Sequence, residues 1–441
     1  MQADDKTAPY PKASAAYLVV GMLLVAYIFA FLDRMALGLV IDPIRADLGL
    51  NDTQISLIAG LAFVLFFVVF SFVFGRLVDT GGRRNIIALG IALWSVAMVA
   101  CGLANNFWQL FAARMMVGVG EASLSPAAYS IIPDYFPPER RGFAMAIYAA
   151  GASIGCGSAM YLGSLLLGWA EATQPVLPLV GQLAPWKVLF IGAGLPGLVV
   201  AVLILLTIRE PKRRQTGPAH TATTIGEVIG YMNTHRKLFL LTFLGFAGFA
   251  ISNYSFTVWG PAFFMRAHGF TPQEAGLLFG FGFGIGGTAG MLLGGYWSDR
   301  EIRKGRAEAP VWVSLRIAWI QLPFFVAAYL VPNATASAIL FCCALFSASM
   351  VGGLQGLMVQ SLTPNRMRGQ AGAIFLTTAN VLGLGIAPIL TGTMTDYVFG
   401  GPAEIGKSLA VTSVLALAVA SVLLTLAMPA VRERTRAILN A

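Results

Sequence analysis

Five charged residues interrupt long apolar stretches that otherwise carry almost no charge. Asp33 and Arg34 are adjacent in the first stretch, Arg114 and Glu121 share the fourth, and Arg316 lies nearer the end of a later one. A charge at the centre of a bilayer costs about 3 kcal/mol on insertion scales, so intramembrane charges usually face a cavity and pair with one another. We therefore expect the first four either to line a pathway for ions or solutes or to form a static ion pair that locks the helices together.

Helical spacing predicts that these four residues form a column. At a rise of 1.5 Å per residue, Asp33 lies about 12 Å in from the outer end of the first predicted helix, and Arg114 lies about 10 Å in from the outer end of the fourth, so their depths are similar. Glu121 follows Arg114 by two helical turns, on the same face and about 10 Å deeper. Protonation of a carboxylate beside an arginine depends on their geometry. Our hypothesis is that Glu121, with Asp33, carries a coupling proton, and that Arg114 or Arg34 then attracts an anionic substrate group.

Other chemistries find little support in the sequence. His220, His235 and His268 fall in a polar segment or near predicted helix ends, away from any nucleophile, and no phosphate-binding P-loop is present. The four cysteines lie within apolar runs, without the spacing of a disulfide framework or a metal site. Gly282–Gly287 matches the G-x-G-x-x-G pattern, but it lies inside an apolar run with no preceding strand. We therefore expect no enzymatic activity, no cofactor and no metal ion.

The composition is that of a membrane protein. Hydrophobic residues make up 57% of the chain and charged residues 11%, whereas soluble proteins average about 25% charged residues. Since about 20 apolar residues span the hydrocarbon as a helix, the sequence predicts an all-α polytopic membrane protein with twelve transmembrane helices. The predicted spans are Ala15–Ile41, Gln54–Val78, Arg84–Leu103, Trp108–Pro133, Gly142–Trp169, Trp186–Ile208, Leu238–Arg266, Glu274–Trp297, Val311–Val331, Ser337–Leu362, Gly369–Val398 and Lys407–Met428.

The basic residues predict the orientation of these helices. Most of the 29 lysines and arginines fall in the N-terminus, alternate loops and the C-terminal tail, all on one side, while Arg45, Lys187, Arg266 and Lys407 fall on the other. By the positive-inside rule, both termini are cytoplasmic in a multi-pass inner (plasma) membrane protein. Topology and contact with anionic membrane lipids then account for the net charge of +9. Nucleic-acid binding is not expected, because the basic residues are spread over separate loops.

A short charged loop occurs twice. Gly75-Arg-Leu-Val-Asp79-Thr-Gly-Gly-Arg83-Arg84 follows one apolar run, and Gly295-Tyr-Trp-Ser-Asp299-Arg300-Glu-Ile-Arg303-Lys304 follows another 220 residues later. The pair Arg141-Gly142 recurs as Arg368-Gly369. The chain therefore resembles two similar halves of six helices each, an arrangement that in transporters places the substrate path between the halves.

The longest polar segment gives the boundary between the halves. We predict an N-terminal six-helix bundle over residues 1–208 and a C-terminal six-helix bundle with a tail over residues 238–441. Residues 209–237 form a cytoplasmic linker, with a surface helix expected over residues 224–237.

These motifs resemble those of the major facilitator superfamily. The string at residues 75–84 is similar to that superfamily's loop between helices 2 and 3, except that Thr80 stands where a basic residue is usual. Arg114-x-x-x-Gly118-x-Gly120-x-Ala122 and Pro137-Pro-Glu-Arg-Arg-Gly142 resemble its fourth-helix motif and the loop that follows. The resemblance implies a central cavity lined by helices 1 and 4, and a cytoplasmic gate at which Asp79 meets the start of helix 11. The gate candidates are Gly75, Asp79, Arg83, Arg84, Arg141, Asp299, Arg300 and Arg368.

Two subfamilies fit these strings. Asp33-Arg34 together with Gly118-Val-Gly120-Glu121-Ala-Ser123 resembles the spinster family of lipid transporters, which we favour, while similar strings occur in organic-anion and sugar-acid symporters. The resemblance implies a monomeric secondary active transporter that works by alternating access, with protons as the coupling ion and an amphipathic or anionic substrate such as a lysolipid or a sphingolipid-like molecule. The alternative is a proton-coupled symporter of organic or sugar acids. A passive channel or lipid scramblase is a third possibility.

The second half offers uncharged groups where the first half is charged. At the spacing of the repeat, Asp33 corresponds to Asn253 and Arg34 to Tyr254. The cavity candidates in this half are therefore polar residues within apolar runs. A single residue of this kind more often forms a hydrogen bond between helices than a contact with a ligand. A pocket charged on one wall and neutral on the other would suit an amphipathic anion. These candidates are Asn253, Tyr254, Gln355 and Asn380.

Overall fold

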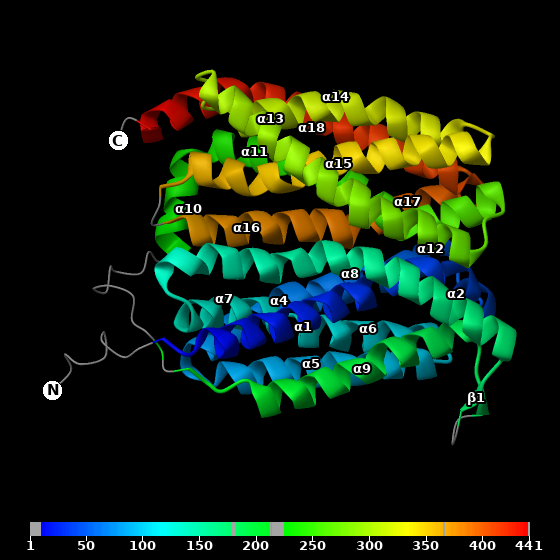
Figure 1. Cartoon of the computed structure of the whole chain (residues 1–441). Coiled ribbons are helices and arrows are strands. Elements are labelled where there is room, and N and C mark those ends of the chain that lie inside the picture. Colours follow the sequence, from blue (N-terminus) through cyan, green and yellow to red (C-terminus); the bar gives the residue numbers. More distant parts are fainter. Residues whose placement is uncertain (1–9, 178–180, 212, 214–224, 365–366, 440–441) are drawn as a thin grey trace. The chain divides into compact units, whose positions relative to one another are not determined.

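The computed structural model describes residues 10–177, 181–211, 213, 225–364 and 367–439, and helices account for nearly all of them (Figure 1). By internal contacts the chain divides into two units. Unit 1 comprises Met1–Leu50 and Leu61–His220, and unit 2 comprises Asn51–Gly60 and Thr221–Ala441. The predicted boundary near residue 209 did not anticipate that ten residues at the start of the second span pack with the later part of the chain.

Unit 1 is built from long apolar helices in which α1 packs on α8, and α5 packs on both α9 and α6 (Figure 1). The short strands β1 (Val176–Leu177) and β2 (Gly181–Gln182) pair antiparallel between α8 and α9. Trp94 and Trp186 are among its largest buried side chains. The helices are α1 (Ala13–Leu39), α2 (Ile41–Leu48), α4 (Ala62–Thr80), α5 (Arg83–Leu103), α6 (Phe107–Glu121), α7 (Leu124–Tyr135), α8 (Pro138–Thr173) and α9 (Pro185–Thr207).

In unit 2, α11 packs on α18, and α14 packs on both α15 and α18. Several spans contain π-helical turns, which continue one helix into the next. The elements are α3 (Asp52–Ser56), η1 (Leu57–Leu61, whose last residue belongs to unit 1), α10 (Ile225–Thr234), α11 (Arg236–His268), α12 (Pro272–Phe281), η2 (Gly282–Gly287), α13 (Thr288–Arg303), α14 (Ala309–Leu330), α15 (Ala334–Leu362), α16 (Arg368–Asn380), η4 (Val381–Ile386), α17 (Ala387–Thr393), η5 (Met394–Val398), η6 (Pro402–Glu404) and α18 (Ile405–Leu439).

Within the described residues, eleven helices are long and apolar enough to cross a membrane. The remaining predicted span, Trp108–Pro133, is two shorter helices, α6 and α7, that meet at Ala122 and Ser123. Pro126 explains the break, because it has no amide hydrogen to donate to the carbonyl four residues earlier. At the break, the Ser123 hydroxyl and backbone nitrogen both donate to the Gly120 carbonyl, over 2.8 Å and 3.2 Å. The twelve-helix prediction is confirmed, and its fourth span is interrupted by a short turn at Ala122 and Ser123, which the sequence analysis did not predict.

The predicted surface helix corresponds to α10, which is shorter than expected because a turn at His235 separates it from α11. Residues 214–224 of the predicted linker lie outside the described part of the chain. Tyr231 of α10 donates a hydrogen bond to the Leu362 carbonyl over 3.0 Å. This bond ties the helix to the end of α15.

The internal repeat is visible in local geometry. Gly49 and Gly269 both end a helix with positive φ, 64° and 69°, a conformation that glycine adopts without strain. Each is followed by a capping box, formed by Asn51 with Gln54 and by Thr271 with Glu274. The two connections therefore share the same backbone design.

The basic pair of the twin loops is not equivalent in the two halves. Arg83 and Arg84 begin α5, but Arg303 ends α13 and Lys304 follows it. The loop before α14 is longer, so α14 begins only at Ala309. The two basic pairs therefore match in residue type but not in their position relative to a helix. Asp79 and Asp299 are equivalent, since both lie near the end of their helices.

Candidate functional site

The four intramembrane charges come together in unit 1. α1 supplies Asp33 and Arg34, and α6 supplies Arg114 and Glu121, the last residue before the break in the fourth span. Asp33, Arg114 and Glu121 are 1–2% exposed, and the Arg34 side chain is 15% exposed. Arg34 is thus the most accessible member of this cluster, which we call the charge cluster.

Arg34 and Glu121 form its central ion pair. Arg34 Nε donates to Glu121 Oε2 over 2.6 Å. The guanidinium carbon also lies 5.1 Å, 4.8 Å and 4.9 Å from the ring centroids of Phe31, Phe63 and Phe67. Aromatic faces at these distances attract a cation. One arginine is therefore held by a carboxylate and three rings at once.

Asp33 and Arg114 were predicted to lie at similar depths, and they are in contact. The acceptor, however, is the Asp33 backbone carbonyl and not its carboxylate. Arg114 Nη1 donates to the Asp33 backbone carbonyl over 3.5 Å and approaches Met98 Sδ at 3.9 Å. Among the described residues, Asp33 Oδ1 and Glu121 Oε1 are buried without a hydrogen-bond partner. A buried carboxylate oxygen without a donor is poorly stabilised as an anion. Asp33 and Glu121 thus each have one carboxylate oxygen that accepts no hydrogen bond from the described residues.

Two glycines bring α6 close enough to build this cluster. A Cβ on Gly118 would collide with the Phe63 carbonyl of α4, and one on Gly120 would meet the Trp94 amide nitrogen and Gly90 carbonyl of α5. Small residues at helix contacts allow such close packing in membranes. The Gly118-Val-Gly120-Glu121 string therefore positions Glu121 between α4 and α5.

Unit 1 also contains a group of tyrosines that the sequence analysis did not single out. Tyr27 lies two turns before Arg34 on the same face of α1 and stacks on Tyr148 of α8 with ring centroids 4.5 Å apart. The Tyr148 hydroxyl lies 3.2 Å from the Ser125 hydroxyl, and Tyr129 meets the Tyr148 ring edge-on. Tyr129 is 55% exposed and therefore offers an amphipathic surface beside the Tyr27–Tyr148 stack.

The uncharged candidates of unit 2 are partly assembled. Tyr254 Oη donates to Asn380 Oδ1 over 3.4 Å, which joins α11 to α16. Asn253, the next residue on α11, is exposed, and Gln355 on α15 is half-buried. The structure thus brings Tyr254 and Asn380 together as an interhelical hydrogen bond and leaves Asn253 accessible.

Among the gate candidates of unit 1, Arg83 has the most contacts. This buried guanidinium pairs with Asp134 of α7, and its Nε donates to Glu210 Oε1 over 2.8 Å. The other oxygen of Glu210 accepts from the Arg84 backbone nitrogen over 2.8 Å. Glu210 therefore caps α5 from the end of α9, a favourable placement for a carboxylate.

Asp79 and Gly75 lie near the end of α4, and the Asp79 side chain is exposed. Arg213 donates to the backbone carbonyls of Asp79, Val78 and Gly81. The predicted contact of Asp79 with the start of helix 11 stays a prediction.

Arg141 and Arg368 make the same contact in their own halves. Arg141 Nε donates to the Phe136 carbonyl over 2.9 Å, and Arg368 Nε donates to the Thr363 carbonyl over 3.2 Å. Asp299 and Arg300 are exposed on α13, while the neighbouring Glu301 pairs with Lys304. Arg141 and Arg368 are therefore equivalent, since each donates to the carbonyl of the residue five positions earlier in the chain.

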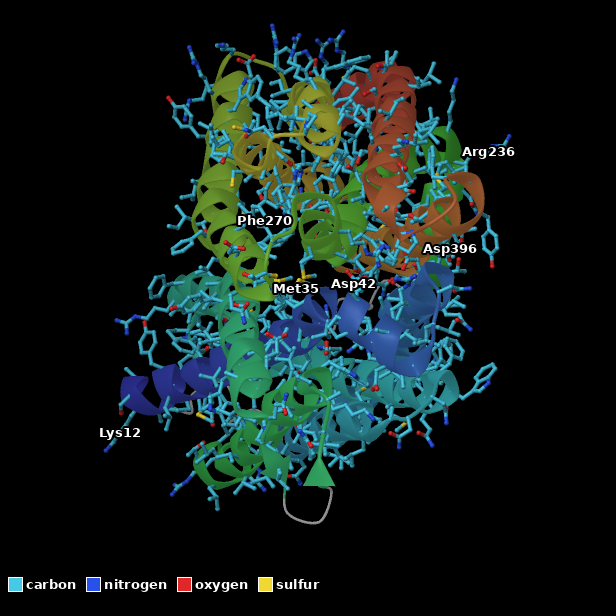
Figure 2. The ribbon with its side chains drawn as sticks, turned by 90° about the vertical axis from the view of Figure 1, so that its right-hand side faces the viewer. Lys12, Met35, Asp42, Arg236, Phe270 and Asp396 are labelled. Carbon is cyan, nitrogen blue, oxygen red and sulfur yellow. The ribbon has the colours of Figure 1, made fainter. Side chains whose placement is uncertain are left out.

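A buried charge network in unit 2 was missed from the sequence. Arg266 at the end of α11 donates to both carboxylate oxygens of the fully buried Asp52, over 2.6 Å and 3.0 Å. Asp396, labelled in Figure 2, accepts from the Thr53 backbone nitrogen and hydroxyl, each over 2.7 Å. Helical periodicity does not predict a contact between residues 214 positions apart, and Arg266 and Asp52 each lie at the edge of an apolar run. This network fixes α3 to α11 and η5.

Comparison with known proteins agrees with this architecture. Residues 23–388 match the model of the Major Facilitator Superfamily, and the chain belongs to this family of membrane transporters. It is 27% identical over 387 residues to an "MFS-type efflux pump" of Mycolicibacterium smegmatis, covering 86% of this chain and 85% of that protein. It is also 27% identical over 391 residues to a "Probable L-galactonate transporter" of Escherichia coli, covering 85% and 82%.

The fold is similar to that of a bacterial homologue of the human lysosomal transporter spinster, solved in an inward-facing, unoccupied conformation. The TM-score is 0.82 at 24% identity, with 98% of this chain and 99% of that chain covered. The resemblance expected from the motifs is confirmed at the level of family and fold.

Proposed function

We propose that this transporter is proton-coupled and moves an amphipathic anion, such as a lysolipid or sphingolipid-like molecule, by alternating access. The observation that carries the proposal is the charge cluster, in which Arg34 and Glu121 pair while Asp33 Oδ1 has no donor among the described residues. Intramembrane charges of this kind usually mark ion or substrate pathways.

The proton would act by releasing Arg34. While Glu121 is ionised, it holds the guanidinium at 2.6 Å. Protonation of Glu121 removes the charge that holds this pair, and Asp33, the neighbour of Arg34 in the chain, is the second proton site. Arg34 then becomes available to an anionic substrate group without leaving its aromatic surroundings. Binding of the anion and of the proton are thereby linked.

The neighbouring rings suggest the rest of the substrate. Phe31, Phe63 and Phe67 surround Arg34, and the Tyr27–Tyr148 stack lies nearby on the same face of α1. An anionic head beside an apolar chain fits a cation set among aromatic side chains better than a fully polar molecule does. This favours a lysolipid-like substrate over a sugar acid.

The two ends of the protein would act as gates. The Asp52–Arg266–Asp396 network holds α3 on unit 2 at the end that carries few basic residues, and we propose that it opens when that side opens. The Asp79 and Asp299 loops would form the gate on the basic, cytoplasmic side, where we place both termini. We expect the monomer to be the working unit, as each chain holds the whole cluster.

The second candidate is a proton-coupled symporter of organic or sugar acids, favoured by the similarity to the L-galactonate transporter. Thermal-shift measurements on the purified protein separate the two, since a ligand that binds the folded state raises its unfolding temperature. We expect lysophosphatidate to stabilise the protein and galactonate to have no effect, and Arg34→Ala to abolish the shift. Stabilisation by galactonate alone would establish the alternative. Gradient-dependent accumulation of the stabilising ligand in liposomes then distinguishes a transporter from a channel or scramblase.

A further inference from the structure

Arg316 is a charged residue within a spanning helix that the charge cluster does not use. It lies seven residues after the start of α14, about 10 Å into the helix, and its side chain is exposed. Its guanidinium carbon lies 3.7 Å from the ring centroid of Trp312, one turn back. The side chain is therefore directed toward the start of α14, as long side chains on helices usually are.

A second cation shares the same ring. The guanidinium carbon of Arg306, in the loop before α14, lies 4.3 Å from the Trp312 centroid. Arg306 pairs with Glu301 at 3.1 Å, and Lys304 pairs with the same carboxylate at 2.6 Å. For Arg316, the described residues provide the Trp312 ring but no carboxylate within ion-pair distance. Glu308, which directly precedes α14, pairs with Arg432 at 2.7 Å. The basic residues at this end of α14 outnumber the two acidic ones, which leaves a net positive surface; they are Lys304, Arg306, Arg316 and Arg432.

A groove that includes the next turn of the same face of α14 lies further from the start of this helix. It lies between α14 and α18, which run side by side near the top of Figure 1, and has a volume of about 280 Å³. Trp319 follows Arg316 by three residues, so both lie on one face of α14. Trp319 is 63% exposed. The groove is lined by Trp319, Ala418, Ser421, Val422, Thr425 and Leu426.

We propose that this groove binds an anionic phospholipid from the bilayer leaflet that meets the basic end of the protein. The phosphate is held by Arg316 with Arg306, and an acyl chain lies along the groove against Trp319. Two features argue for a lipid. The groove lies between spanning helices, where the surrounding medium is hydrocarbon. An arginine whose side chain reaches toward the membrane interface is stabilised there by the anionic head group of a lipid. Basic pockets between helices on the cytoplasmic side bind lipid head groups in this way.

This site is distinct from the charge cluster, since it lies in unit 2 on α14, α18 and the loop before α14. It does not depend on which substrate the protein carries. A lipid there fills the face between α14 and α18. It also supplies the counter-charge that Arg316 lacks among the described side chains. Its role is that of a bound cofactor lipid that stabilises unit 2.

Native mass spectrometry of the delipidated, full-length protein tests the proposal. Phosphatidylglycerol is titrated against phosphatidylcholine and against inorganic phosphate. We expect one phosphatidylglycerol to bind more tightly than phosphatidylcholine, and phosphate alone not to be retained. Arg316→Gln should weaken phosphatidylglycerol binding about fivefold, the effect expected for one basic residue at a lipid surface. Arg236→Gln is the matched control, because this arginine projects from the ribbon in Figure 2 and begins α11; it should bind as the parent does.

A second variant tests the groove independently of the charge. Ala418 is exposed on the groove wall, so Ala418→Phe should fill the groove without disturbing the core, and it should weaken long-chain more than short-chain phosphatidylglycerol. Equal weakening by Arg316→Gln and Arg236→Gln would show a diffuse charge effect and overturn the proposal. So would unchanged binding to both Arg316→Gln and Ala418→Phe. A dimer that forms in place of lipid binding would assign the face to a second copy of the chain.

Discussion

At the scale of residues, the protein places one arginine between a carboxylate and three aromatic rings. Arg34 has its acidic partner, Glu121, at 2.6 Å, and the Glu121 side chain is fully buried. Loss of one member of a buried pair leaves the other charge uncompensated, which costs more than the pair itself contributes. Because a guanidinium stays protonated in proteins, the ion pair is stabilising only while Glu121 is ionised.

We expect Arg34→Gln to lower the free energy of unfolding by about 3 kcal/mol, because it leaves Glu121 without its ionic partner. The double variant Arg34→Gln/Glu121→Gln should recover most of this loss. A double-mutant cycle of thermal unfolding in detergent measures the coupling. Arg84→Gln is the control, since that guanidinium bonds to the neighbouring Asn85 at the surface. Equal unfolding temperatures for the two single arginine variants would show that the pair does not contribute.

At the scale of elements, the close contacts of α6 and of α3 position the functional groups. α6 approaches α4 at Gly118, and its end at Glu121 coincides with the break caused by Pro126. α3 is held to α17 as well, since the Ser56 hydroxyl donates to the Pro388 carbonyl over 2.7 Å. The site thus depends on helix ends and on a few small residues.

Gly118→Ala should destabilise the protein by about 1–3 kcal/mol, the usual cost of overpacking, because its Cβ would collide with the Phe63 backbone. Gly142→Ala, in α8, has open space around the added carbon and should be neutral or slightly stabilising. Unfolding temperature and expressed yield are the measurements. A Gly118→Ala protein as stable as Gly142→Ala would mean that α6 has room to move away from α4.

Arg266→Gln should release α3, because it leaves the buried Asp52 without its ionic partner. We expect a cysteine introduced at the buried Ser56 to react faster with a water-soluble maleimide in this background. Lys407→Gln removes an exposed pair with Glu404 near the start of α18 and should leave the rate unchanged. If Arg266→Gln leaves the Ser56→Cys reaction as slow as in the parent, the network does not hold this gate.

The elements show which parts of the structure were predictable from sequence. Long apolar runs predicted twelve spans, because hydrophobic length is a strong local signal. The break at Ala122 was missed, since Pro126 lies in an otherwise apolar run and proline is common in spanning helices. The Asp52–Arg266 pair was missed because it depends on packing between segments that are far apart in the chain. The Asp33–Arg114 contact was expected, but not that it would use a backbone carbonyl.

At the scale of the whole molecule, the two halves repeat their turns and caps but differ in their charges. The connections at Gly49 and Gly269 are alike in φ and in their capping boxes, whereas the charge cluster belongs to unit 1 alone. Unit 2 has an uncharged contact, the Tyr254–Asn380 hydrogen bond, at the position that corresponds to Arg34 in the repeat. We infer that the repeat supplies the architecture for alternating access and that its broken symmetry places proton coupling in the first half.

The orientation of the molecule is testable with two positions in unit 2. Arg236 begins α11 and Lys407 lies near the start of α18, close to where Arg266 at the far end of α11 contacts the Pro402 carbonyl. The two are therefore at opposite ends of the spanning helices. In intact cells we expect Lys407→Cys, and not Arg236→Cys, to be labelled by a membrane-impermeant maleimide. The reverse pattern would place both termini outside.

The most direct test of the central claim is substrate transport in proteoliposomes driven by an imposed pH gradient, with the stabilising ligand as substrate. We expect Glu121→Gln and Asp33→Asn each to lose pH-driven transport while still exchanging substrate across the membrane at equilibrium. Glu171→Gln, an exposed carboxylate near the end of α8, should behave as the parent. Full pH-driven transport by both Glu121→Gln and Asp33→Asn would contradict the assignment of proton coupling to the charge cluster.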